Sequence, residues 1–213
     1  MSRLKLYLAP GTCALAVHIA LHEADAGHEL ALVNFAASQQ RSPEYLAVNP
    51  KGRVPALVTE QGVLTETPAL LLYVAQLFPA AQLAPLDDLF ALARMQECNN
   101  YLASTVHINH AHRPRASRWA DEPEAIAGMQ RKVAQNMTEN FRYLEQTYLQ
   151  NGPWVLGERY SVADGYLYTV GDWLASDGVD IRDFPAVYAH RERVLQRPAV
   201  QRALATAQLP KAS

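Results

Sequence analysis

The chain has 213 residues, of which 49% are hydrophobic, and its formal net charge is -2. This length allows one large domain or two small ones, and the apolar content allows a sizeable buried core. The charged residues are spread along the chain, with no basic run of the kind that binds phosphate backbones, so we expect no nucleic-acid partner. No apolar stretch reaches the ~18 residues of a membrane span, and residues 1–9 lack the apolar core of a signal peptide. We therefore expect no membrane partner.

The two cysteines, Cys13 and Cys98, indicate a reducing compartment. They lie far apart in the sequence, share no metal-ligand spacing, and are too few for a disulfide-stabilised scaffold. The sequence therefore predicts a cytoplasmic protein. Cys98 is expected to be a core residue of a helix, since most lone cysteines are small buried hydrophobic side chains.

Strand and helix patterns alternate over the first 80 residues. Pro10 and Gly11 end the first strand, and Thr67 and Pro68 suit the N-cap and first turn of a helix. The expected elements are, in chain order, a strand at 4–9, a helix at 12–26, a strand at 28–35, a short helix and turn at 42–50, a hairpin of strands at 54–60 and 62–66, and a helix from 67 to 79. This order predicts a compact α/β unit with a mixed sheet.

The rest of the chain is expected to be helical. Apolar residues recur at helical spacing at 89–112, 123–150, 161–176, 184–196 and 198–207. The sequence therefore predicts an N-terminal domain at 1–80, a linker at 81–88 and an all-helical C-terminal domain at 89–213.

Cys13 lies where the first strand gives way to the first helix. The N-terminus of a helix carries partial positive charge and unpaired N–H groups, so it stabilises a thiolate and lowers the pKa of a thiol placed there. We favour a functional cysteine over a small buried hydrophobic residue. Position 16 is alanine, so Cys13 has no local resolving cysteine, and any disulfide partner is expected to be a small thiol from solution.

Two further stretches carry binding chemistry. If the Val54-Pro55 bond is cis, the backbone of Val54 can pair with an extended peptide, although an ordinary trans proline at a strand start is equally consistent. Glu66 and Thr67 precede a helix start, whose N–H groups can hold a carboxylate while the Glu66 side chain holds an ammonium. This pair suits an α-amino-acid head group. The alternative is that Thr67 only caps the helix and that the negative charge of Glu66 only interacts favourably with the helix dipole.

Together these stretches resemble a glutathione transferase of the bacterial beta class, whose hallmark is a cysteine at this place. The resemblance spans nearly the whole chain and depends on four motifs in family order: KLYLAPGTCALAVHIAL, YLAVNPKGRVPALV, LTETPALLLYVA and GERYSVADGYLY. In the last motif Ser161 would cap a helix and Asp164, three residues on, would reach back to the cap.

The resemblance implies an α/β thioredoxin-like N-terminal domain, an all-α C-terminal domain and a homodimer. By motif match, Cys13 would lie near the glutathione sulfur, and Val54, before a cis Pro55, would pair with the cysteinyl backbone of glutathione. Glu66 and Thr67 would bind the γ-glutamyl head.

The motif NNYLASTVH of the second domain implies further site residues. By the same match, Asn100 would lie near the partner's glutathione, His107 near the sulfur, and Ser104 on the nearby face. A histidine there can accept a thiol proton or stabilise a thiolate. His110 and His112 lie close in sequence, but no cysteine or acidic partner is obvious, so we expect no metal.

The function that the resemblance implies is conjugation of the glutathione thiol to small hydrophobic electrophiles, with glutathione as co-substrate. Two alternatives stay open: glutathione-dependent thiol transfer or disulfide reduction through Cys13, and a non-catalytic interaction protein of the same fold. Leu8, Ala14 and Ile108 depart from the residues common in the family.

Overall fold

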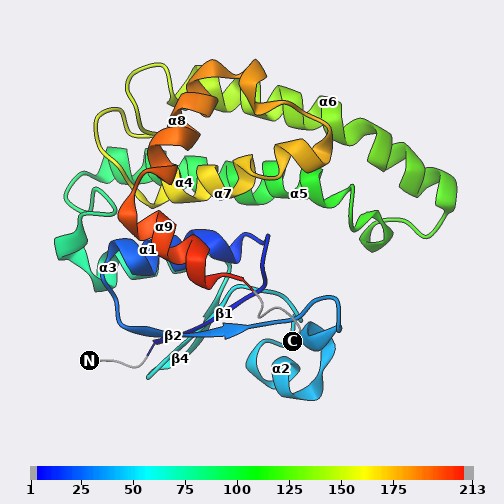
Figure 1. Ribbon diagram of the computed structural model, residues 1–213, viewed down its shortest axis with the longest axis horizontal. Helices are drawn as coiled ribbons and strands as arrows, with labels where there is room; N and C mark the ends of the chain where they lie inside the picture. The colour runs from blue at the N-terminus through cyan, green and yellow to red at the C-terminus, as the bar shows by residue number, and fades with distance from the viewer. Residues whose placement is uncertain (1–3, 209–213) are drawn as a thin grey trace. The chain divides into compact units, whose positions relative to one another are not determined.

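The sheet near the N-terminus is mixed, as the sequence predicts. In the computed structural model, which describes residues 4–208, four strands form this sheet in the order β2-β1-β3-β4 (Figure 1). Strand β1 runs parallel to β2 and antiparallel to β3, and β3 pairs antiparallel with β4. The strands are β1 (Leu4–Leu8), β2 (His28–Leu32), β3 (Ala56–Thr59) and β4 (Gly62–Thr65). The second strand is thus shorter than the expected 28–35, because the chain turns soon after Leu32.

Helices cover both faces of this sheet. Figure 1 shows α1 (Ala14–Glu23) and α3 (Thr67–Leu77) on one side of it and α2 (Pro43–Val48) on the other. Both α1 and α3 bury apolar side chains, among them Ile19 and Leu70. The α/β unit is therefore a three-layer arrangement in which β1, with both edges paired, lies inside the sheet.

The last helix, α9 (Pro198–Thr206), packs on α1. Arg197 makes two hydrogen bonds to the carboxylate of Glu23, at 2.5 and 2.9 Å, and α9 buries Val200 and its alanine neighbours. By its contacts the chain divides into one unit that runs to Leu89 and resumes at Leu195, and a second unit at Phe90–Val194. By these contacts, residues 195–208 thus group with the first unit.

The second unit is helical. A helix was expected over 89–112, but its backbone forms a π-helix at Leu102–Val106, between α4 and α5. Cys98 is fully buried in α4, as expected for a core residue. None of the helices in the described part of the chain is long and apolar enough to cross a membrane. The principal helices are α4 (Leu89–Tyr101), α5 (His107–Ala111), α6 (Pro123–Tyr148), α7 (Val162–Gly171) and α8 (Pro185–Leu195).

The start of α7 confirms the expected N-cap pair. The Oγ of Ser161 accepts a hydrogen bond from the helix backbone, and the carboxylate of Asp164 accepts one from the backbone N–H of Ser161 at 2.8 Å. The same carboxylate accepts from the N–H of Val155 at 2.8 Å and from Nε2 of His190 at 2.9 Å. Asp164 therefore joins the cap to the preceding loop and to α8.

Candidate active site

Three of the sequence-predicted stretches meet at one edge of the sheet. Tyr7 pairs with Ala56, and Ala56 pairs with Thr65. The carboxyl end of β1, the start of β3 and the end of β4 therefore lie side by side. Cys13 follows the first of these ends, Val54-Pro55 precedes the second, and Glu66 follows the third.

Cys13 occupies the N-cap position of α1. The turn that leads to it contains Gly11, whose φ of 71° is a conformation that glycine adopts readily, and a hydrogen bond from Thr12 Oγ1 to the Ala9 carbonyl at 2.6 Å. The Cys13 side chain is 6% exposed, and its sulfur lies 3.8 Å from the carbonyl oxygen of Val54. Neither Cys13 nor Cys98 is in a disulfide. The thiol thus lies at the helix N-terminus that the sequence predicts, beside the Val54 backbone.

The Val54-Pro55 peptide bond is cis, which decides between the two alternatives that the sequence left open. The loop before it is held by two side chains: the hydroxyl of Tyr45 and the Nδ2 of Asn49 each donate to the carbonyl of Arg53 at 2.7 Å. Both donors are buried. They fix the backbone that leads into Val54.

Gly52 tightens the same loop. Its φ is +60°, and a Cβ at this position would lie 2.9 Å from the backbone oxygen of Gln40 and 2.9 Å from a guanidinium nitrogen of Arg41. Its N–H donates to the carbonyl of Asn49 at 2.9 Å. A side chain at Gly52 would therefore meet both an unfavourable backbone angle and a close contact.

Glu66 and Thr67 lie at the start of α3, with Glu66 at the N-cap and Thr67 buried. Glu66 has a φ of 70°, an uncommon conformation for a residue other than glycine, of the kind that concentrates at functional sites. The Nζ of Lys51 lies 2.5 Å from a carboxylate oxygen of Glu66 and 2.7 Å from Oγ1 of Thr65. A cation, a carboxylate and a helix N-terminus therefore meet here, which suits a ligand carrying both an ammonium and a carboxylate.

Lys51 is the site residue that sequence reasoning missed. It lies 15 positions before Glu66, so no local motif joins the two. The available signal was its position in PKGRVP, three residues before Val54. The hairpin register brings the loop before β3 to the end of β4, and this register places Lys51 beside Glu66.

The remaining candidates, Asn100, Ser104 and His107, belong to the second unit. The Oγ of Ser104 donates to the carbonyl of Asn100 at 2.8 Å, and the π-helix that contains Ser104 ends just before His107. An Arg115 guanidinium nitrogen lies 3.3 Å from Nε2 of His107, and the His107 ring centre is 4.9 Å from that of Trp173. π-Helical turns often occur at functional sites. The roles of these residues toward glutathione stay predictions.

Comparison with known families accounts for both units. The N-terminal domain of glutathione S-transferases matches residues 2–76, and the C-terminal domain of the same family matches residues 102–198. The chain belongs to the glutathione S-transferase family. Glutathione S-transferase GstA of Escherichia coli O157:H7 is 33% identical over 208 residues, which cover 94% of this chain and 97% of that protein.

Solved structures of this family have closely similar folds. A glutathione transferase homolog from Sulfitobacter, crystallised with bound glutathione, aligns with a TM-score of 0.94 and 43% identity, over 98% of this chain and 100% of that one. The beta-class glutathione S-transferase of Sphingomonas chungbukensis aligns with a TM-score of 0.84 and 33% identity, over 97% of this chain and 100% of that one. The expected family and its thioredoxin-like and helical domains are therefore confirmed.

Proposed function

We propose that this glutathione S-transferase binds glutathione along the sheet edge described above and joins the glutathione thiol to small hydrophobic electrophiles. The observation that carries the proposal is the meeting of Cys13, Val54 and Glu66 at that edge. The similar Sulfitobacter homolog, which holds glutathione in its crystal, supports it.

Each part of the tripeptide has a group of suitable chemistry at this edge. The carboxylate of Glu66 takes the ammonium of the γ-glutamyl residue, and the first N–H groups of α3, beginning at Thr67, take its carboxylate. The backbone of Val54, before Pro55, pairs with the cysteinyl residue as an added strand would. This arrangement brings the glutathione thiol toward Cys13.

The conjugation step needs a glutathione thiolate. The thiol releases its proton to water, the thiolate sulfur attacks the electrophilic carbon, and the leaving group departs with the electron pair of the broken bond. The N-terminus of α1 stabilises negative charge on a nearby sulfur. Because Arg115 can only donate hydrogen bonds, Nε2 of His107 accepts from it, and the ring hydrogen of His107 is on Nδ1. We propose that this Nδ1–H donates to the glutathione thiolate and stabilises it.

Thiol transfer is the second candidate, favoured by the position of the Cys13 sulfur at a helix N-terminus. In that reaction the Cys13 thiolate attacks the glutathione sulfur of a mixed disulfide and releases the other thiol. A second glutathione thiolate then attacks the Cys13–glutathione disulfide, which releases oxidised glutathione and restores Cys13.

Two further elements belong to the proposal. The protein is expected to be a homodimer in which Asn100 lies near the glutathione of the other subunit, with Ser104 close by. The electrophile is expected to bind in an apolar cleft. The sedimentation coefficient of the purified chain tests whether it is a dimer. Retention on immobilised glutathione distinguishes a transferase from an interaction protein that no longer binds glutathione.

The first experiment is a calorimetric titration of the reduced protein with glutathione. We expect Glu66→Gln to weaken binding by about tenfold or more, which corresponds to about 1.4 kcal/mol. Glu60→Gln is the matched control, because Glu60 lies in the turn at the opposite end of the β3–β4 hairpin. Absence of binding by the wild-type protein, or equal affinities for both variants, would refute the proposed site.

The second experiment compares two reactions in Cys13→Ala. A chlorodinitrobenzene reports conjugation, and a mixed disulfide of glutathione with a small thiol reports transfer. If conjugation is the function, the wild-type protein turns over the electrophile, and Cys13→Ala still binds glutathione while conjugating more slowly. Turnover of the disulfide alone, abolished in Cys13→Ala, would establish thiol transfer instead.

A further inference from the structure

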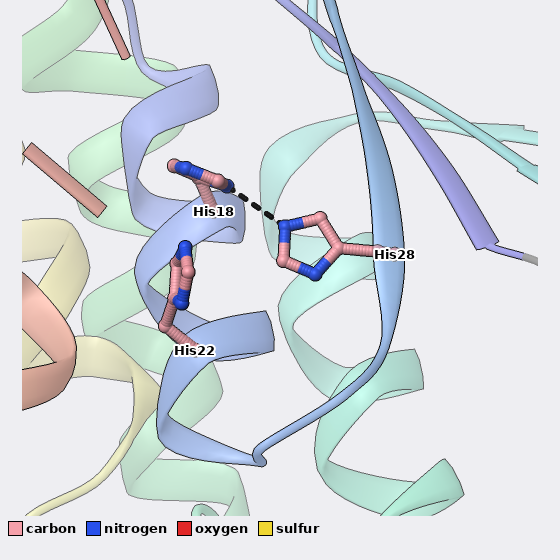
Figure 2. Close-up of side chains that lie close together, drawn as sticks. All are labelled: His18, His22 and His28. Carbon is pink, nitrogen blue, oxygen red and sulfur yellow. Dashed lines mark hydrogen bonds between the residues drawn. The ribbon is translucent and has the colours of Figure 1, made fainter. Parts of the chain in front are cut away.

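Three histidines lie together at the opposite edge of the same sheet. His18 and His22 are one helical turn apart on α1, and His28 is the first residue of β2 (Figure 2). His28 pairs with Leu4, at the other end of β1 from the glutathione edge. One ring nitrogen from each histidine lies within 4.8 Å of the other two. The cluster thus lies within the first unit, away from the glutathione edge.

The ring of His28 is oriented by its own loop. Its Nδ1 lies 2.7 Å from the carbonyl oxygen of Ala26. Because a carbonyl only accepts, Nδ1 carries the hydrogen and Nε2 of the neutral ring presents a lone pair. Histidines that bind metals are commonly held in this way, with the second nitrogen donating to a backbone carbonyl.

The ring of His18 presents a lone pair toward the same point. Its Nε2 lies 2.8 Å from Oγ1 of Thr206, and that hydroxyl lies 3.0 Å from the carbonyl oxygen of Arg202, to which it donates. When the hydroxyl donates to this carbonyl, its oxygen accepts from Nε2–H of His18, and Nδ1 of His18 presents a lone pair. This Nδ1 lies within hydrogen-bond distance of Nε2 of His28, at 3.1 Å, and the dashed line in Figure 2 marks this hydrogen bond.

Without an ion, Nδ1–H of His18 can donate to Nε2 of His28; in the other tautomer of His18, the two nitrogens present lone pairs that a cation between them would bind. In a tetrahedral zinc site with Zn–N distances of about 2.05 Å, two ligand nitrogens are about 3.3 Å apart. The observed separation of 3.1 Å is close to that value. The pair therefore has the spacing of two ligands on one metal ion.

His22 supplies the third nitrogen. Its ring centre lies 4.5 Å from that of His18 and 5.2 Å from that of His28. Among the residues 4–208, Nε2 of His22 is buried and has no hydrogen-bond partner. A buried polar atom without a partner requires an explanation, and a bound cation is one.

The cluster is largely enclosed by the protein. His18 is 1% exposed, and His22 and His28 are partly buried. Metal ions bind the neutral form of imidazole, in which one ring nitrogen presents a lone pair.

We propose that His18, His22 and His28 bind a divalent transition-metal ion, Zn²⁺ in the first instance, with water as the fourth ligand. Three imidazole nitrogens suit zinc and its neighbours, whereas magnesium and calcium prefer oxygen ligands. Because the ligands come from α1 and β2, and His18 contacts Thr206 of α9, the ion would hold these three elements together. The site does not depend on the proposed function.

The test is a calorimetric titration of the full, tag-free chain with ZnCl₂ in metal-free buffer. The wild-type protein is expected to bind one equivalent with a Kd at or below about 1 µM. His22→Gln and His28→Gln are expected to weaken binding by roughly 100-fold or more, as loss of a ligand does. His112→Gln is the matched histidine control and Cys13→Ala the thiol control, and both are expected to bind as the wild type does.

Thermal unfolding gives an independent readout. Zn²⁺ is expected to raise the Tm of the wild-type protein and of His112→Gln, but not of His28→Gln, because only a folded site binds the ion. Circular dichroism checks that each variant is folded before titration. The proposal is overturned if the wild type does not bind Zn²⁺, or if either His22→Gln or His28→Gln binds it as tightly as the wild type.

Discussion

Replacing Asp164 by alanine tests the packing of the second unit. The Asp164 side chain is 0% exposed, and its carboxylate accepts from the backbone N–H groups of Ser161 and Val155 and from Nε2 of His190. The Oγ of Ser161 also donates to this carboxylate, at 3.2 Å, so alanine would remove four acceptor contacts at once and leave their donors in the interior of the unit. The effect should therefore exceed the loss of an ordinary helix cap.

The size of this effect follows from the number of donors. A buried donor left without a partner costs roughly 1–3 kcal/mol, so we expect Asp164→Ala to lower the free energy of unfolding by about 4 kcal/mol. Ser161→Ala removes only the hydroxyl that caps α7 and should cost about 1 kcal/mol. A loss of about 4 kcal/mol is a large part of the 5–15 kcal/mol typical of a folded domain.

The assay is urea unfolding followed by tryptophan fluorescence. The chain has three tryptophans, and all lie in the second unit: Trp119, Trp154 and Trp173. The signal therefore reports on the unit that contains Asp164. An Asp164→Ala variant whose unfolding midpoint falls no further than that of Ser161→Ala would show that the buried donors find other partners, and would refute the reasoning.

Three further predictions concern other parts of the chain. Burial raises the pKa of the Cys98 thiol well above its ordinary value, so at pH 8 its reactive thiolate is scarce. Iodoacetamide should leave Cys98 unlabelled in the folded protein and label it after unfolding; mass spectrometry showing equal labelling would contradict this. Gly52→Ala should lower the free energy of unfolding by about 1 kcal/mol or more, and it should weaken glutathione binding. An unchanged urea midpoint would show that a side chain at position 52 causes no strain. Lys51→Met should change the free energy of unfolding by less than about 1 kcal/mol, because the side chains of Lys51 and Glu66 are 42% and 66% exposed. A larger loss would show that this ion pair contributes more to stability than an exposed pair does.

Several features of the fold and site could be predicted because their causes are local. Pro10 and Gly11 separate the end of β1 from the start of α1, and Cys13 lies at that start. Ser161 and Asp164 form a capping box because their spacing of three residues matches one helical turn. In each of these cases the deciding groups lie within a few residues of one another.

Other features were decided only by the tertiary structure. The π-helix at Leu102–Val106 has no local breaker, since neither glycine nor proline interrupts this stretch. Arg197 meets Glu23 across 174 positions because α9 returns to α1, a contact that the spacing of apolar residues in α9 cannot specify.

The two proposed sites show the same division. The sequence placed Cys13 at the N-terminus of a helix, but the sheet register brought Lys51 to Glu66. Helical spacing put two histidines one turn apart on α1, but the pairing of β1 with β2 brought His28 to them. Residue types and local spacing determined which groups could do chemistry, and the register of the strands determined which of them meet, because that register depends on the packing of the whole sheet.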